Sequence, residues 1–172
     1  MDPRQNLTPA HELFHLIQNG ATFFKNRWFT EGTARWSEKG LGQGALGTGL
    51  RGVWPPTPAT LERLDSMAYD ACAQFWEPWL LSFDTPDTIP ADRLPPELTA
   101  LHYTDGSPVL KDHQLHGWPI VRRLLQELAR ADDTAHTERH LTQWTEEEQR
   151  SPKNTPHLLQ AINSLTSSPP KE

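Results

Sequence analysis

The chain has 172 residues, a net charge of −6 and an apolar content of 35%, to which seven tryptophans and six phenylalanines contribute. This length is enough for one domain with its own core, and without a basic run we expect no nucleic-acid partner. The single cysteine, Cys72, excludes an internal disulfide and a cysteine-based zinc site, and we expect it to be buried and inert. No membrane-spanning segment is predicted, so we expect no membrane partner. Residues 1–10 lack the apolar core of a signal peptide, which leaves the location open.

The first predicted helix begins with Thr8 as its N-cap and Pro9 at its first helical position. It carries the letters HELFH, a match to the HExxH pattern. Residues four apart share one face of a helix, so His11 and His15 can offer two imidazole nitrogens to one metal ion. Glu12 lies beside them.

The remaining positions of this helix are apolar, and they predict that it is buried on its other faces: Leu13, Phe14, Leu16 and Ile17. Buried polar groups need partners, and for two histidines on such a helix a metal ion would be one. The alternative is a pair of core histidines held by ordinary hydrogen bonds.

A second helix is predicted to begin at Glu31, with Thr30 as its cap, and to continue through Trp36. A carboxylate in its first turn completes a set of two histidines and one glutamate, which leaves the fourth tetrahedral position for water. The alternative for Glu31 is a surface carboxylate favoured by the helix N-terminus. Glu38, two turns further on, either orients a ligand histidine or, as we expect in preference, is a solvated charge.

The segments HELFHLIQ and WFTEGTARW together resemble the gluzincin zinc metallopeptidases, whose HExxH helix and downstream E-G-x-A helix bind one catalytic zinc. The resemblance covers residues 7–38 with specificity. It implies His11, His15 and Glu31 as zinc ligands, Glu12 as general base, and a peptide or protein as substrate. It also implies a tyrosine or histidine donor further downstream, for which the candidates are Tyr69, Tyr103, His113 and His116.

Gluzincins normally have a β-sheet subdomain ahead of the zinc helix, whereas only ten residues precede His11 in this chain. We therefore expect the usual sheet subdomain to be lacking here. The chain is then either a minimal form or a piece of a larger protein.

The glycine-rich segment 40–52 is predicted to be a loop, with an active-site flap as the alternative. Gly42, Gly44 and Gly47 match GxGxxG literally, but the match follows a predicted helix where a dinucleotide site requires a strand. We therefore expect no nucleotide cofactor.

Thr57 and Pro58 repeat the cap-plus-proline pattern and begin a long predicted helix that Pro78 should kink or end. Its apolar positions recur at three- and four-residue spacing: Leu61, Leu64, Ala68, Ala71, Phe75 and Trp79. The proline-rich residues 84–96 are predicted to be an irregular connection.

Three further helices are predicted, over about 119–131, over about 137–150 and after the pair Thr155 and Pro156. In the first, the outward positions are Arg122, Arg123, Glu127 and Arg130, and the inward ones are Ile120, Val121, Leu124, Leu125 and Leu128. The last buries Leu158, Leu159, Ile162 and Leu165. His136 and His140 are also four apart, but they lie among charges, and we expect solvated side chains in preference to a second metal site.

Together these patterns predict a mainly α fold, a helical zincin-like core of about five to six helices with little or no β. Residues 1–166 form the single domain, and residues 167–172 form a disordered tail. The expected function is zinc-dependent hydrolysis of peptide bonds. The alternatives are a catalytically silent zinc-binding domain, a fragment of a larger metallopeptidase that acts as an interaction module, and a helical interaction module in which HELFH is a coincidence.

Overall fold

The structure is a computed structural model, which describes residues 7–38, 58–83, 96–109 and 117–166. These residues are mainly helical, and an isolated bridge between His102 and Pro108 is the one β-type pairing among them. The prediction of a mainly α fold of about five to six helices with little or no β is confirmed. The elements are, in chain order, α1 (Thr8–Ala21), α2 (Arg27–Ser37), α3 (Pro58–Leu64), the π-helix η3 (Cys72–Trp76), α4 (Glu77–Leu80), α5 (Pro96–Thr99), α6 (Trp118–Glu138), α7 (Glu146–Arg150), the 3-10 helix η5 (Pro152–Asn154) and α8 (Thr155–Thr166).

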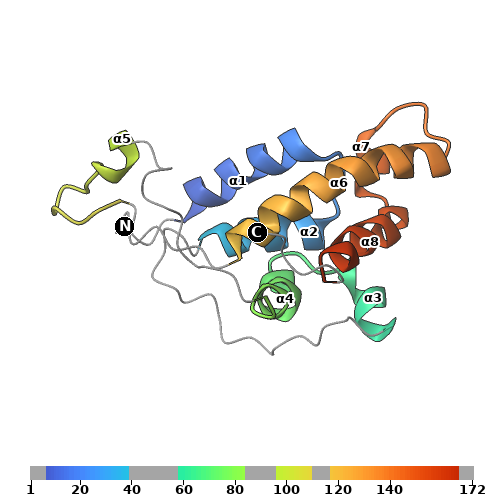
Figure 1. Cartoon of the computed structure of the whole chain (residues 1–172), viewed down its shortest axis with the longest axis horizontal. Helices are drawn as coiled ribbons and strands as arrows, with labels where there is room; N and C mark the ends of the chain where they lie inside the picture. Colours follow the sequence, from blue (N-terminus) through green and yellow to red (C-terminus); the bar gives the residue numbers. More distant parts are fainter. Residues whose placement is uncertain (1–6, 39–57, 84–95, 110–116, 167–172) are drawn as a thin grey trace.

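The two helices that carry the HELFH and EGTA segments lie next to each other. α1 packs against both α2 and α6, α2 also packs against η3, and α6 packs against α8 (Figure 1). The E-G-x-A helix is therefore held between the HExxH helix on one side and the π-helix on the other.

α1 differs from its predicted form in two respects. Leu7 is the residue at its N-cap, so Thr8 is the first helical residue and not the cap. The expectation of a helix buried all round is wrong, because the apolar side chains on its outer side are 46–66% exposed: Leu13, Leu16 and Ile17. Its buried residues are His11, Phe14 and Gln18, so a single stripe of α1 is buried.

α2 begins at Arg27, four residues earlier than predicted. Thr30 is inside the helix, where its hydroxyl donates to the Asn26 carbonyl at 3.3 Å, and it does not act as the cap. The early start has a tertiary cause, because Trp28 in the first turn is fully buried in the core. Glu31 consequently lies in the second turn of α2 and not at its N-terminus.

The long helix predicted after Pro58 is interrupted. α3 ends at Leu64, and turns occupy most of residues 65–69 before the chain becomes helical again. The expected apolar side nevertheless faces the core, since these residues are buried: Leu64, Ala71, Phe75 and Trp79.

Pro78 lies within α4 and does not end it, because the helix continues to Leu80. The helical hydrogen-bond pattern changes before Pro78, in the π-helix, where the Glu77 amide donates to the Cys72 carbonyl. Cys72 itself is buried, as predicted.

α6 extends from Trp118 to Glu138, well beyond the predicted end at residue 131. Its additional turns include the buried Asp132, which accepts hydrogen bonds from the Thr22 hydroxyl at 2.8 Å and from the Phe23 amide at 3.0 Å. The predicted helix over 137–150 is wrong, because its first two residues belong to α6 and only its last five form α7.

The inward positions predicted for α6 are all buried, as are three of the four predicted for α8. The buried residues are Ile120, Val121, Leu124, Leu125, Leu128, Leu158, Ile162 and Leu165. Leu159 is half-buried and packs against this core.

The core beside α2 is aromatic. Trp28 and Trp76 are stacked with ring centroids 5.6 Å apart, and the Trp76 indole N–H donates to the Trp28 carbonyl at 2.7 Å. Gly32 makes this approach possible, since a Cβ atom there would lie 2.6 Å from Cδ1 of Trp76. The glycine of the E-G-x-A segment therefore has a packing role.

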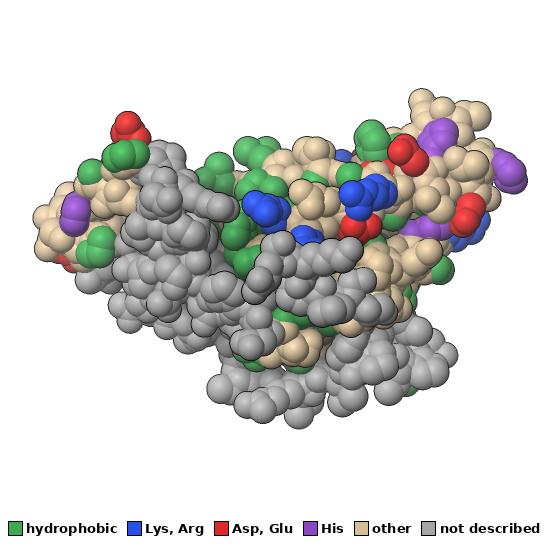
Figure 2. Space-filling model, in the orientation of Figure 1, with side chains coloured by type: hydrophobic (Ala, Val, Ile, Leu, Met, Phe, Trp, Pro, Cys, Tyr) green, Lys and Arg blue, Asp and Glu red, His purple; other side chains and the backbone are tan. Residues whose placement is uncertain are grey.

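On the surface view of Figure 2, Asp and Glu side chains are interspersed with Lys and Arg side chains, and no single charge type dominates the coloured area. None of the helices in the described ranges is long and apolar enough to cross a membrane.

Several predicted features lie outside the described residues. These are the glycine-rich loop 40–52, residues 84–95 of the proline-rich connection, His113, His116 and the tail 167–172.

Candidate metal centre

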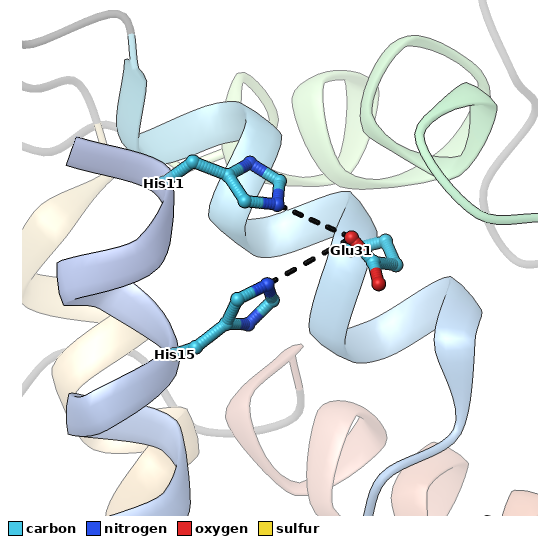
Figure 3. Close-up of side chains that lie close together, drawn as sticks. All are labelled: His11, His15 and Glu31. Carbon is cyan, nitrogen blue, oxygen red and sulfur yellow. Dashed lines mark hydrogen bonds and ion pairs between the residues drawn. The ribbon is translucent and has the colours of Figure 1, made fainter. Parts of the chain in front are cut away.

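His11 and His15 project from one side of α1 toward Glu31 on α2 (Figure 3). Nε2 of His11 lies 3.2 Å from Oε2 of Glu31, and Nε2 of His15 lies 3.8 Å from the same oxygen. The histidines are one helical turn apart, and Glu31 belongs to the neighbouring helix. The three residues named from the sequence are therefore brought together.

The spacing of the three donor atoms fits a small cation. The donor atoms of His11, His15 and Glu31 all lie within 4.8 Å of one another. A tetrahedral zinc site with bonds of about 2.1 Å places its donor atoms about 3.4 Å apart, a value that the two distances to Glu31 bracket. Two imidazoles and a carboxylate are also a donor set that zinc accepts in catalytic sites.

Glu38 is buried and holds the ring of His11. It is 4% exposed, and its Oε1 lies 2.9 Å from Nδ1 of His11. Its other oxygen accepts a hydrogen bond of 2.5 Å from Arg35. The expectation of a solvated Glu38 is wrong, because the C-terminal end of α2 packs beside the start of α1 and encloses the carboxylate. The alternative, in which Glu38 orients His11, matches the observed contact.

Gln18 holds the second ring in the same way, and the sequence analysis did not single it out. Its amide nitrogen donates to the Thr30 carbonyl at 2.9 Å and to the Thr33 hydroxyl at 2.6 Å. Its oxygen therefore faces Nδ1 of His15, at 2.7 Å. The available signal was its position one turn after His15, on the side of the helix that carries both histidines.

These contacts indicate the tautomer of both rings. A carboxylate and an amide oxygen can only accept, so Nδ1 of His11 and Nδ1 of His15 are the donors. In a neutral imidazole the other nitrogen, Nε2, then carries a lone pair. Both Nε2 atoms then face the same carboxylate oxygen of Glu31, so three donor atoms are directed at the space where a cation could bind.

The centre opens onto a groove of about 910 Å³. His15 and Glu31 line this groove, and so does the exposed side chain of Glu12. A molecule in the groove can therefore meet the candidate metal ligands and the candidate general base together.

Of the two candidate downstream donors that the structure describes, Tyr69 and Tyr103, Tyr69 is the one whose ring contacts His11. Its ring centroid lies 5.5 Å from that of His11, and its side chain is 54% exposed. Tyr103 belongs to a short turn, where its amide donates to the Ser107 carbonyl at 2.8 Å. His113 and His116 lie outside the described residues.

The second histidine pair does not share a helix. His136 is in the last turn of α6 and packs near Trp144, whereas His140 follows the helix with φ of 52° and is exposed. Within the described ranges, the trio of His11, His15 and Glu31 is the one group of three or more His, Cys, Asp or Glu side chains close enough to share an ion.

Comparison of the chain with models of known protein families, with curated proteins and with solved structures found no match. The resemblance to gluzincins accordingly depends on the residues of the two motifs alone.

Proposed function

We propose that the chain is a zinc-dependent peptidase that hydrolyses peptide bonds in the groove beside His15 and Glu31. The observation that carries the proposal is the convergence of two imidazole Nε2 atoms and one carboxylate oxygen at a groove that Glu12 also lines. A structural zinc site usually has four protein ligands, whereas three ligands leave a position open to the groove.

In this proposal His11, His15 and Glu31 hold the zinc. Zinc in such a site supplies Lewis acidity, which makes water more acidic and polarises a carbonyl oxygen. Glu38 and Gln18 keep the two imidazole rings in the orientation and tautomer that binding requires.

Glu12 acts as the general base. Water adds its oxygen to the scissile carbonyl carbon while Glu12 accepts a proton from it, and the C–N bond then breaks as Glu12 passes that proton to the leaving amine. The exposure of Glu12 in the groove gives a bound peptide access to its carboxylate.

The second candidate is a zinc-binding domain without catalytic activity that serves as an interaction module. The observation in its favour is the exposed apolar surface formed by Leu13, Leu16, Ile17 and Phe23, which a partner protein would cover.

Glu12→Gln separates the two candidates. The wild-type chain loaded with zinc should cleave an unfolded protein such as reduced casein, and a chelator should stop the cleavage. Glu12→Gln should retain its zinc and lose at least about 100-fold in rate, the low end for removal of a general base. Glu97→Gln, an exposed glutamate outside the groove, should retain full activity. Zinc binding without any chelator-sensitive cleavage would instead support the silent domain.

A further inference from the structure

The groove beside the candidate metal centre has a cationic part. Lys25, Arg27 and Arg150 line it together with His15 and Glu31. Three cations in one groove contrast with the net charge of −6 of the whole chain.

Two of these cations have no ion-pair partner among the residues that the structure describes. Arg150 pairs with Glu146 at 2.8 Å, but Lys25 and Arg27 form no ion pair with any residue of the described ranges. Unpaired cations are common on an open surface, but here they line a concavity, where a ligand can reach both of them.

The cations are close to Glu31, the proposed metal ligand that lines the same groove. Arg27 and Glu31 are four residues apart on α2, so their Cβ atoms lie about 5–6 Å apart on one face of the helix. The Lys25 amide donates to the Gln149 carbonyl at 2.7 Å, which holds this part of the chain against α7. An anionic group bound by Lys25 and Arg27 would therefore lie within a residue or two of a peptide bond placed beside Glu31.

The chemistry of the groove favours a carboxylate on a peptide. The guanidinium group of arginine offers paired N–H donors that match the two oxygens of a carboxylate. Leu13 and Leu16, exposed on α1, add an apolar wall on which peptide side chains can pack.

We infer that the groove selects peptides that carry a carboxylate near the bond to be cleaved, and that Lys25 and Arg27 bind this carboxylate. The inference rests on the proposed peptidase function, whose site it extends. The carboxylate can belong to an aspartate or glutamate side chain or to the C-terminus of the peptide.

The test measures affinity, so that it does not depend on turnover. Three N-acetylated hexapeptides of alanine and leucine are titrated calorimetrically into zinc-loaded Glu12→Gln protein. The first has a central glutamate and an amidated C-terminus, the second a central glutamine and a free C-terminal carboxylate, and the third a central glutamine and an amidated C-terminus. We expect the first or the second to bind at least tenfold more tightly than the third, and whichever does so identifies the source of the carboxylate.

Variants then assign the effect to the two cations. Lys25→Gln and Arg27→Gln, each added to Glu12→Gln, should remove most of the preference, whereas Arg122→Gln, which removes an exposed charge on α6, should leave it unchanged. Arg27→Gln should fold, because a cation in the first turn of a helix is not a stabilising feature. Equal affinity for the three peptides, or a preference that survives both substitutions, would overturn the inference. A preference without any cleavage by the wild-type chain would overturn only the peptidase function.

Discussion

Nδ1 of His11 lies 2.9 Å from Oε1 of Glu38, a residue 27 positions further along the chain. The contact joins the start of the HExxH helix to the residue that follows α2, and both side chains are buried. It gives the glutamates near the centre different roles. Glu31 faces Nε2 of His11, on the side of the candidate metal, whereas Glu38 faces the opposite nitrogen of the ring.

Replacement of these two glutamates should therefore weaken zinc binding to different degrees. Glu31→Gln removes a proposed ligand and should largely abolish tight binding. Glu38→Gln leaves an acceptor for His11 but removes the negative charge, and should weaken binding by about tenfold to a hundredfold. Zinc titration against a competing chelator measures both effects, with Glu97→Gln as the control. Release of the metal by Glu38→Gln together with its retention by Glu31→Gln would show that the third ligand is wrongly assigned.

Gln18→Leu should weaken zinc binding and also destabilise the metal-free fold. The substitution removes the acceptor that orients His15, which should lower zinc affinity by about tenfold or more. It also leaves the Thr30 carbonyl without its side-chain donor, which should lower the free energy of unfolding by about 1–3 kcal/mol. Urea denaturation and chelator competition measure the two effects, and Gln126→Leu on the exposed side of α6 is the control. An unchanged affinity would mean that the contact between Gln18 and His15 does not position the ring.

Gly32→Ala should destabilise the fold, whereas Gly20→Ala should not. A methyl group at residue 32 would lie 2.6–2.7 Å from the Trp76 ring, and the overcrowding should cost about 1–3 kcal/mol. Gly20, in the last turns of α1, has nothing within 4 Å of the added carbon, so alanine there should stabilise the helix by up to about 1 kcal/mol. Thermal and urea unfolding of the two variants measure the contrast. Equal stabilities would contradict the close packing of α2 on Trp76.

The stability of the metal-free fold should depend on the ionisation of Asp132. Burial raises the pKa of its carboxyl from 3.8 to about 6, although hydrogen bonds from the Thr22 hydroxyl and the Phe23 amide act in the opposite direction. Because the folded pKa lies above the unfolded one, the stability that this group contributes is fully present below about pH 4 and is lost as the pH rises through about 6. The free energy of unfolding should consequently fall by up to about 3 kcal/mol over this interval.

Asp132→Asn removes the titrating group and should flatten this part of the pH profile. The measurement is urea denaturation of the metal-free wild-type and variant proteins at several values between pH 4 and pH 7. The difference between the two profiles isolates the contribution of Asp132. Profiles that run parallel from pH 4 to pH 7 would contradict a contribution of Asp132 to the pH dependence of stability.

Much of the centre was predictable because its geometry is local. The spacing of His11 and His15 places them on one helical face whatever the surroundings. In the same way, the apolar periodicity of α6 identified the buried side of that helix. Glu31 was predicted from its place at the start of the next helix and from the resemblance to a family, although the expected helix start beside it was wrong. Thr30 has the chemistry of a cap, but the burial of Trp28 extends α2 by a turn, and helix propensity alone does not predict that.

The remaining features depend on contacts between distant parts of the chain. Glu38 has the composition of a surface residue, and only the packing of α2 beside α1 encloses it with His11. The apolar residues around α1 give no single buried side, so the exposure of Leu13 and Leu16 could not be read from periodicity. The extension of α6 also depends on distant contacts. Its added turns include the buried Asp132, which accepts hydrogen bonds from residues more than 100 positions earlier in the chain.

Zinc stoichiometry tests the central claim most directly. Protein purified without a chelator, and then titrated with zinc against a competing chelator, should bind about one zinc ion per chain. The parallel titration of His15→Ala, which removes a partly exposed residue proposed as a ligand, should show loss of tight binding in a protein that still folds. A wild-type chain that takes up no zinc, or a His15→Ala variant that binds it as tightly as the wild type, would contradict the assignment of His11, His15 and Glu31 as a metal site.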